Sequence, residues 1–232
     1  MQDWVSFWDS NHPIYVNARH FDVHYRAIAA DIIRLLPSVE ARVLDHGCGE
    51  AIHADIVAAK AREVLLCDAA ASVRNAIAAR FAGNPKIRTI PPEELESLGD
   101  ASFDLIFANS LVQYLSAAEL DQTLALWRRL LAPGGTLIVA DVIPPDVGAV
   151  SDVIALLRYA VANGFLVAAL IGLVRTALSP YRKLRNELGI ARYTEPAFLA
   201  RLRATGFTGE RMGRNVEHNP ARMTFRARLA ER

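Results

Sequence analysis

Residues 43–51 have the sequence VLDHGCGEA, in which an apolar run reaches an acid and is followed by two glycines. A short apolar run before a glycine turn predicts a buried β-strand, and glycine lets the backbone turn tightly and approach a ligand because it has no Cβ. The next apolar run ends at Asp68, 21 residues after Gly47. An acid at that spacing can accept hydrogen bonds from both hydroxyls of a ribose. The pattern therefore predicts an open α/β sheet that binds a nucleoside-type cofactor.

The rest of the glycine pattern separates two kinds of cofactor. A loop that binds a pyrophosphate has a third glycine, which here would fall at Ile52, where a branched side chain would crowd the helix against the phosphates. Asp45 leads the pattern instead, and an acid beside a ligand without phosphates suits a cationic amino group. The stretch therefore favours a nucleoside that carries an amino group over a dinucleotide.

In this form, acid-x-Gly-x-Gly-x-Ala, the stretch resembles the first motif of the class I methyltransferases that depend on S-adenosylmethionine, in their Rossmann-like, small-molecule type. In that family the turn faces the methionine part of the cofactor, and the acid after the second strand holds the ribose. The chain departs from the family at Ala51, where a third glycine is usual. The resemblance implies S-adenosylmethionine as the cofactor. The cofactor-binding residues that it implies are Asp45, Gly47, Cys48, Gly49, Asp68, Ala69, Glu93, Glu94, Asn109 and Ser110.

The resemblance covers residues 40–142, and its next segment follows the expected third strand. Residues 91–95 have the sequence PPEEL. Relatives often place an acid there to hold the amino group of adenine, but this chain has proline at the usual acidic position. Two interpretations stay open: either Glu93 or Glu94 replaces that acid, or both are solvated on a loop or short helix.

Two later segments complete the resemblance. Residues 103–110, FDLIFANS, form an expected strand that ends at Asn109, and in the family this strand end lies under the sulfonium and the methyl group. Residues 131–141, LAPGGTLIVAD, are similar to the helix stop and fifth strand of the family. Their Pro-Gly-Gly predicts the end of a helix and a turn with positive φ that leads into the sheet.

Short apolar strands alternate with helical segments along the chain, which predicts a parallel sheet covered on both faces. The fold class is therefore α/β: a doubly wound, mostly parallel seven-stranded sheet with helices on both faces, an antiparallel C-terminal strand pair and a helical insertion after strand 5. We expect one domain over 1–232, with a cap segment at 1–36 and a helical lid or insertion at 146–190. The expected helices are 19–36, 51–60, 70–82 and 118–131, and the expected strands are 42–46, 63–68, 87–90, 103–108, 135–141, 207–214 and 221–229.

The composition of the chain limits the kinds of partner and the cellular location that we expect. The formal net charge is +1, so the whole chain has no bias toward nucleic acid, and no nucleic-acid partner is expected. Two cysteines, Cys48 and Cys67, do not make a disulfide framework, and no metal-ligand spacing exists, so we expect no metal. The first residues lack a basic start and an apolar core, so we expect no signal peptide and a cytoplasmic location.

The N-terminal segment is rich in aromatic residues and histidines. His20 and His24 are four residues apart and share one helix face, and either could remove a proton from a hydroxyl or amine near neutral pH. The alternative is that both are surface or capping residues. Tyr15, Tyr25 and Tyr114 are the candidate substrate-binding residues, although aromatic side chains of this segment could simply fix it to the core.

The insertion at 150–188 contains the most apolar run of the chain, residues 165–174. A run of this length is too short to cross a bilayer as a helix, which takes about 20 residues. Three interpretations remain: a lid on the site, a homodimer interface, or a helix on a membrane surface. Residues 175–232 carry thirteen basic and five acidic side chains, which keeps peripheral membrane contact through 163–185 open.

These observations predict an enzyme that transfers the methyl group of S-adenosylmethionine to a small-molecule or lipid-like acceptor, by O- or N-methylation. Two alternatives remain. A non-catalytic protein that binds S-adenosylmethionine would keep the same crevice, and a nicotinamide-dependent oxidoreductase would need to bind its dinucleotide despite Ile52.

Overall fold

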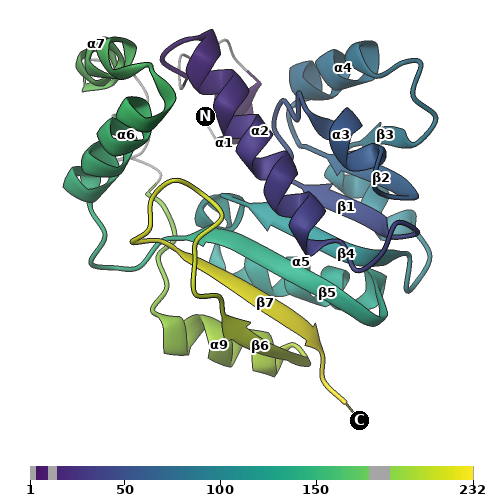
Figure 1. The fold of residues 1–232 in the computed structure, drawn as a ribbon. Helices are drawn as coiled ribbons and strands as arrows, with labels where there is room; N and C mark the ends of the chain where they lie inside the picture. Colours follow the sequence, from purple (N-terminus) through teal and green to yellow (C-terminus); the bar gives the residue numbers. More distant parts are fainter. Residues whose placement is uncertain (1–3, 10–14, 178–188, 232) are drawn as a thin grey trace.

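The computed structural model describes residues 4–9, 15–177 and 189–231, which form a seven-stranded sheet with helices on both sides (Figure 1). The strand order is β3-β2-β1-β4-β5-β7-β6. The first five strands in that order are parallel, and β7 runs antiparallel to both of its neighbours. The expected sheet and its antiparallel C-terminal pair are thus confirmed. The strands are β1 (Arg42–His46), β2 (Glu63–Cys67), β3 (Ile87–Ile90), β4 (Phe103–Asn109), β5 (Leu131–Val142), β6 (Phe207–Arg211) and β7 (Met223–Leu229).

The helices divide into two layers and a separate pair. One layer, on one face of the sheet, contains α2, α3 and α4, and the other layer contains α5, α9 and the 3-10 helix η1. The pair α6 and α7 lies beside the sheet and beyond the N-terminal end of α2 (Figure 1). The helices are α1 (Trp4–Trp8), α2 (Ala18–Leu35), α3 (Ala54–Ala58), α4 (Ala71–Arg80), η1 (Pro92–Ser97), η2 (Val112–Tyr114), α5 (Ala117–Leu130), α6 (Ala149–Asn163), α7 (Leu166–Ala177) and α9 (Glu195–Ala204).

The central strands β1, β2, β4 and β5 are mostly apolar and buried because both of their faces are covered. Side chains alternate along a strand, so neighbouring residues enter different layers. Leu44 and Ile106 pack with α5 and α9, whereas Val43 and Phe107 pack with α2, α3 and α4. All four are fully buried. This double core fixes the strand ends from which the cavity side chains extend.

The start of α3 differs from the expected helix at 51–60. The helix begins only at Ala54, because Ala51 has a φ of +40° and therefore lies outside the helical region. Positive φ is the conformation that glycine adopts without steric cost, which explains why relatives usually have glycine at this position. The alanine keeps the turn but shortens the helix.

The junction between α5 and β5 also differs from the prediction. α5 ends at Leu130, three residues before Pro133, and Leu131 already pairs with Phe103 in the sheet. The register then shifts between Phe103 and Leu105, and Gly134 has a φ of +78°. The Pro-Gly-Gly segment is therefore an irregularity within β5 rather than the helix stop.

The C-terminal strand pair is shorter than the sequence predicts. β6 ends at Arg211 and β7 begins at Met223, compared with expected boundaries of 214 and 221. The longer loop between them reaches the carboxyl edge of the sheet, where Asn215 hydrogen-bonds Asp141. This loop contributes to the candidate site described below.

The insertion after β5 is a helical hairpin. Gly164 ends α6 in the left-handed conformation with a φ of +76°, which lets the chain reverse into α7. The inner side of the hairpin packs on α2 through Ala160, Phe165, Ala169 and Val23. Residues 178–188 of the expected insertion lie outside the described residues. Within the described chain, every helix is too short or too polar to span a bilayer.

Candidate active site

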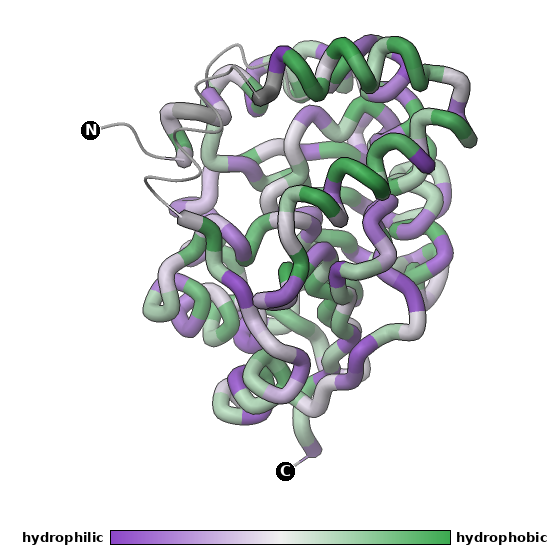
Figure 2. The backbone as a smooth tube through the Cα atoms, turned by 90° about the vertical axis from the view of Figure 1, so that its left-hand side faces the viewer, coloured by the Kyte–Doolittle hydropathy of each residue, from purple (hydrophilic) through white to green (hydrophobic). Residues whose placement is uncertain are grey.

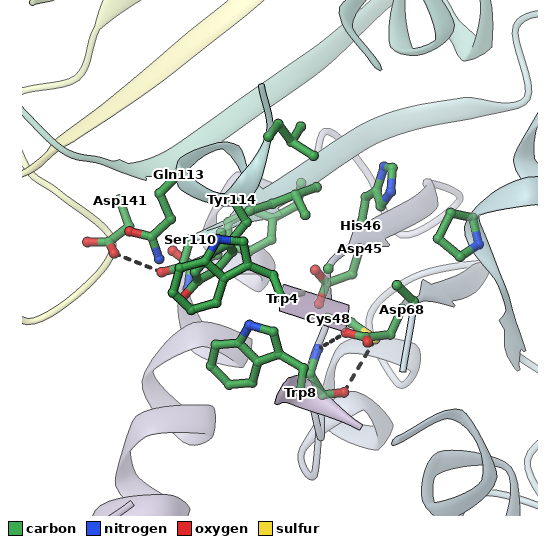
Figure 3. A pocket seen from close by; sticks show the side chains of 18 of the residues that line it. Trp4, Trp8, Asp45, His46, Cys48, Asp68, Ser110, Gln113, Tyr114 and Asp141 are labelled. Carbon is green, nitrogen blue, oxygen red and sulfur yellow. Dashed lines mark hydrogen bonds between the residues drawn. The ribbon is translucent and has the colours of Figure 1, made fainter. Parts of the chain in front are cut away.

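β1 and β4 lie side by side at the centre of the sheet. β2 and β3 extend from β1 in one direction, and β5, β7 and β6 extend from β4 in the other. In a doubly wound sheet, ligands bind beyond the carboxyl ends of the strands at this reversal. A cavity of about 910 Å³ lies there (Figure 3). Its polar wall is formed by side chains at or just after the ends of four strands, which are Asp45, Asp68, Asn109 and Asp141.

The turn after β1 is fixed to β2 by backbone hydrogen bonds. The N–H groups of Gly47 and Cys48 donate to the carbonyl oxygen of Cys67 at 2.8 and 3.2 Å. Gly47 has a φ of +78°, and a Cβ there would lie 3.1 Å from the side chain of Leu111. Burial raises the pKa of the Cys48 and Cys67 thiols, so both are protonated packing groups at neutral pH.

Tyr25 of α2 contacts the same turn through its hydroxyl group. Its hydroxyl oxygen accepts a hydrogen bond from Glu50 N at 2.8 Å and from the Tyr15 hydroxyl at 3.1 Å. A Cβ on Gly49 would lie 2.5 Å from this oxygen, so only glycine fits. Burial raises the pKa of both tyrosines well above the ordinary value, so neither acts as a base at neutral pH.

Asp68 joins the glycine turn to the start of α4. Its two carboxylate oxygens accept hydrogen bonds from Gly49 N and Ala70 N, each at 2.9 Å. Each oxygen keeps a second lone pair, because a carboxylate oxygen can accept two hydrogen bonds. Burial raises the pKa of Asp68, and the two backbone donors oppose that shift. The neighbouring Ala69 also lines the cavity.

Asp45 is a buried acid of the site, with 5% of its surface exposed. Its carboxylate accepts no hydrogen bond from any described residue and lies on the cavity (Figure 3). Burial, and secondly the charge of Asp68, raise the pKa of Asp45 to about 7. A buried carboxylate without a partner is costly, and a cation in the cavity would compensate it.

Ser110 and Asp141, from the ends of β4 and β5, form one strained unit. Their φ angles are +54° and +63°, values that residues other than glycine rarely adopt. Ser110 Oγ donates to Asp141 Oδ2 at 2.8 Å. Asp141 also pairs with Arg222 and hydrogen-bonds Asn215. Backbone strain of this kind persists only where the surrounding structure fixes the conformation, and strained residues are concentrated at ligand-binding and active sites.

Glu217 is a site residue that the sequence did not indicate. Its carboxylate accepts a hydrogen bond from Asn109 Nδ2 at 2.8 Å, and Nδ1 of His24 and Nδ1 of His218 lie 3.5 and 3.3 Å from its other oxygen. Burial alone would raise its pKa, but the two histidines and the amide hold the pKa well below the usual range. Glu217 is therefore a buried carboxylate that stays charged beside His24.

The two candidate histidines lie in different surroundings. Burial, and secondly the nearby His24 and His218, lower the pKa of His20 to about 4, so His20 is neutral at physiological pH. Its ring stacks on Phe165 at 4.8 Å, and its Nδ1 lies 3.4 Å from the backbone N–H of Val16. His24 also lines the cavity and is the histidine beside Glu217.

Aromatic side chains from the N-terminal segment cover one end of the cavity. The ring of Tyr114 lies 4.7 Å from that of Trp4 and 5.7 Å from that of Trp8, measured between centroids (Figure 3). Trp4 and Trp8 belong to α1, and Tyr114 follows β4. The N-terminal segment thus contributes to the cavity wall.

The two candidate acids after β3, Glu93 and Glu94, differ in their position relative to the cavity. Glu93 lines the cavity, whereas Glu94 is exposed on η1 and is not part of the lining. On the other side of the site, His46 Nδ1 accepts a hydrogen bond from Trp127 Nε1 at 3.0 Å. Burial lowers the pKa of His46 to about 4, so this acceptor is neutral.

Most of the site residues predicted from the sequence line one cavity, but the sequence did not indicate several polar residues that also line it. The lining includes every predicted site residue except Glu94. Asp141 ends an apolar strand and so had a signal, but the residues after β6 had none, because only the folded chain brings that loop to the site. Among the described residues, no cluster of three or more potential ligands could hold a metal ion. The polar lining residues that were missed include His46, Gln113, Asp141, Glu217, His218 and Arg222.

Residues 44–139 match the family model described as a methyltransferase domain. Over these residues the chain therefore resembles a methyltransferase domain. The match spans β1 to β5 and hence the strand ends that form the polar wall of the cavity. No curated protein sequence matches the chain.

Solved structures of methyltransferases share the fold of this chain. DhpI in complex with S-adenosylhomocysteine is 15% identical, with 98% of this chain and 96% of that chain covered and a TM-score of 0.62. A putative methyltransferase in a complex with the Haloferax volcanii Trm112 activator is 14% identical, with both chains fully covered and a TM-score of 0.63. Phosphoethanolamine N-methyltransferase 1 of Haemonchus contortus, with phosphoethanolamine and S-adenosylhomocysteine, is 26% identical over 62% of this chain and 32% of that one, with a TM-score of 0.51.

The arrangement of the two acids suits a ligand that carries an ammonium group and a ribose, as S-adenosylmethionine does. The unpartnered Asp45 carboxylate fits an ammonium group, and the spare lone pairs of Asp68 fit the hydroxyls of a ribose. Gly47, whose positive φ bends the backbone, lines the same cavity as these two acids. Each feature belongs to the segment that matches the methyltransferase domain.

Proposed function

We propose that this methyltransferase transfers the methyl group to a hydroxyl or amine of a small, partly apolar acceptor, with His24 as the general base. The observation that carries the proposal is the approach of His24 Nδ1 to within 3.5 Å of Glu217 Oε2. Both residues line the same cavity as Asp45 and Asp68. A base and the cofactor-binding acids therefore share one enclosed space, as methyl transfer to a protonated acceptor requires.

At the cofactor end of the cavity, three residues bind and orient. Asp45 pairs with the ammonium group, Asp68 accepts from the ribose hydroxyls, and the Gly47 turn approaches the methionine part closely. When bound there, S-adenosylmethionine supplies an electrophilic methyl group on a positively charged sulfur. Because that leaving group is already good, alignment of the acceptor by the protein contributes much of the rate acceleration.

At the acceptor end, Glu217 orients the ring of His24 and selects its tautomer. A charged carboxylate facing Nδ1 favours the tautomer with hydrogen on Nδ1, which leaves the lone pair on Nε2. Glu217 stays charged because the neighbouring histidines and Asn109 lower its pKa. His24 Nε2 then takes the proton that the acceptor loses. His20 has a packing role in this scheme, since its ring is stacked on Phe165.

The walls around His24 indicate the acceptor class. The ring of Tyr15 lies 5.3 Å from that of His24 and 5.5 Å from that of neutral His20, and further aromatic side chains line the cavity. These rings favour an acceptor with an apolar part beside its nucleophile. The likeness to a phosphoethanolamine N-methyltransferase supports an amine as one of the two nucleophiles.

The test is methyl transfer to a panel of small hydroxyl and amine compounds, followed by S-adenosylhomocysteine release between pH 6 and 9. His24→Gln should lower kcat at least about 100-fold near neutral pH, with partial recovery at high pH, and should leave S-adenosylmethionine affinity within about twofold. The matched control is His53→Gln, because His53 bonds Asp22 and is not part of the lining. Full kcat in His24→Gln across the range would refute the base, and cofactor binding without any turnover would favour a non-catalytic protein.

A further inference from the structure

We propose that the α6–α7 hairpin docks the protein on an anionic lipid surface. The first observation is where apolar side chains are exposed. Of the ten large hydrophobic residues exposed in the described part of the chain, eight belong to α6 and α7. Figure 2, which looks onto this side of the molecule, shows both helices as largely green. A contiguous apolar surface of this kind marks an interaction site.

The exposed residues form one stripe on each helix. On α6, Val150, Ile154 and Val161 are 74, 45 and 65% exposed, and their spacing places them on one helix face. On α7, Val167 and Val174 are 72 and 63% exposed and lie seven residues apart. Leu166, Leu170 and Ile171 belong to the same face of α7.

The opposite sides of the two helices are already occupied. Ala160, Phe165 and Ala169 are buried against α2. Gly172 lies so close to Val16 that an added Cβ would stand 2.2 Å from a Val16 methyl carbon. The hairpin is therefore fixed to the protein by one side, and its outward stripes serve no packing function within the described chain.

Charge on the hairpin selects anionic lipid as the occupant. Arg158 is exposed on the α6 stripe, four residues after Ile154, and Arg175 is exposed directly after Val174. Neither arginine forms an ion pair with another described residue. The single carboxylate on the two helices, Asp152, is bound by Arg222. A second copy of this face would bring arginines together with no free acid, whereas a surface of anionic headgroups neutralises them.

The helix lengths fit a position on the surface of a bilayer. α6 has 15 residues and α7 has 12, and a span takes about 20. The two stripes would enter the boundary between headgroups and acyl chains, with the arginines at the level of the headgroups. This is the arrangement of an interfacial helical hairpin rather than of a membrane-spanning one.

Docking would also bring the cavity close to the lipid. Tyr159 on α6 stacks on His218 with ring centroids 5.1 Å apart, and Phe165 stacks on His20. The hairpin is therefore in contact with the acceptor end of the cavity. If the proposed function holds, an acceptor that partitions into membranes would reach the site from this surface, but the docking itself does not depend on that function.

The experiment is flotation of the full chain with phosphatidylcholine vesicles that contain or lack phosphatidylglycerol. We expect flotation with the anionic vesicles only, weakened by high salt. Val167→Glu with Val174→Glu should reduce the bound fraction at least about tenfold, and Arg175→Glu should reduce it on anionic vesicles. The matched control is Val39→Glu, because Val39 is 68% exposed but lies between α2 and β1.

Each other outcome counts against the proposal. Absence of flotation, or equal loss in Val39→Glu, would overturn it. So would a dimer in light scattering that the Val167→Glu and Val174→Glu variant abolishes, because the stripes would then cover a second copy. Thermal melting and S-adenosylmethionine calorimetry on the same variants show that they fold. Failure of docking and failure of the proposed function remain distinguishable. If only the proposed function fails, the protein loses turnover but still floats with the vesicles.

Discussion

Asp45 near the end of β1 and Asp68 directly after the neighbouring parallel strand β2 line one cavity, and the charge of Asp68 adds to burial in raising the pKa of Asp45 to about 7. The two acids differ in their partners. Asp68 accepts two backbone hydrogen bonds, whereas Asp45 accepts none from the described residues. The protein therefore keeps one acid fixed and leaves the other available for a cationic ligand, at a cost to its own stability.

The first prediction concerns that cost. The folded pKa of Asp45 is above its unfolded value, so the native state binds the extra proton and stability falls as pH rises from about 4 to about 7. Asp45→Asn should therefore stabilise the ligand-free protein at pH 8 by about 2 kcal/mol and should have little effect at pH 4. Thermal melting at both pH values measures this. Asp55→Asn, at an exposed position of α3, is the control. A lower melting temperature for Asp45→Asn at pH 8 would contradict the account.

The second prediction concerns cofactor affinity. If Asp45 pairs with the ammonium group, only its ionised form binds well, so affinity for S-adenosylmethionine should rise about eightfold from pH 6 to pH 7.5. Calorimetry in buffers with different ionisation enthalpies should also detect proton release on binding. Asp45→Asn should bind at least about tenfold more weakly and lose the pH dependence. An unchanged slope in that variant would assign the titration to another group.

The third prediction concerns His46, whose Nδ1 accepts from Trp127 Nε1. The folded pKa of His46 is below its unfolded value, so its contribution to stability is present above about pH 6.5 and is lost as pH falls toward 4. His46→Leu leaves the indole N–H without its acceptor and should cost about 1–3 kcal/mol at pH 7.5. His46→Gln keeps an acceptor and should lessen the loss at acid pH. Chemical denaturation at pH 7.5 and 4.5 tests both, and equal stability of the two variants at pH 7.5 would refute the hydrogen bond.

The grouping of the residues around the glycine turn was predictable because its signals are local. The turn at residues 43–51 and Asp68 lie on two successive strands, so motif and spacing alone bring them together. The acceptor half was not predictable in this way. Asn109 and Glu217 are hydrogen-bonded across 108 residues of sequence, and only the antiparallel return of β7 beside β5 makes them neighbours.

His20 and His24 show what helical spacing predicts and what it does not predict. A spacing of four residues placed His20 and His24 on one helix face, and both do line the cavity. Their chemistry differs because Phe165 covers one ring and Glu217 faces the other. Both partners come from segments more than 130 residues away in sequence. Helix geometry therefore predicted the positions, whereas tertiary packing decides which group each ring contacts.

The last prediction uses the contact between Gly49 and Tyr25. Gly49→Ala would place a Cβ 2.5 Å from the tyrosine oxygen at a φ of +55°, so either the turn or the ring must move. We expect S-adenosylmethionine affinity to fall at least about tenfold and stability to fall by about 1–3 kcal/mol. Gly83→Ala is the control, because nothing lies within 4 Å of a Cβ at that position.

A second substitution separates the clash from the backbone strain. Tyr25→Phe removes the hydroxyl, and the next ring atom would lie 3.6 Å from the new methyl group, an ordinary contact. Calorimetry and melting of both single variants and the double variant form a double-mutant cycle. The double variant should recover part of the affinity that Gly49→Ala loses, although Glu50 N then lacks its acceptor. Strictly additive losses would mean that positive φ alone, and not the hydroxyl of Tyr25, requires glycine in the turn.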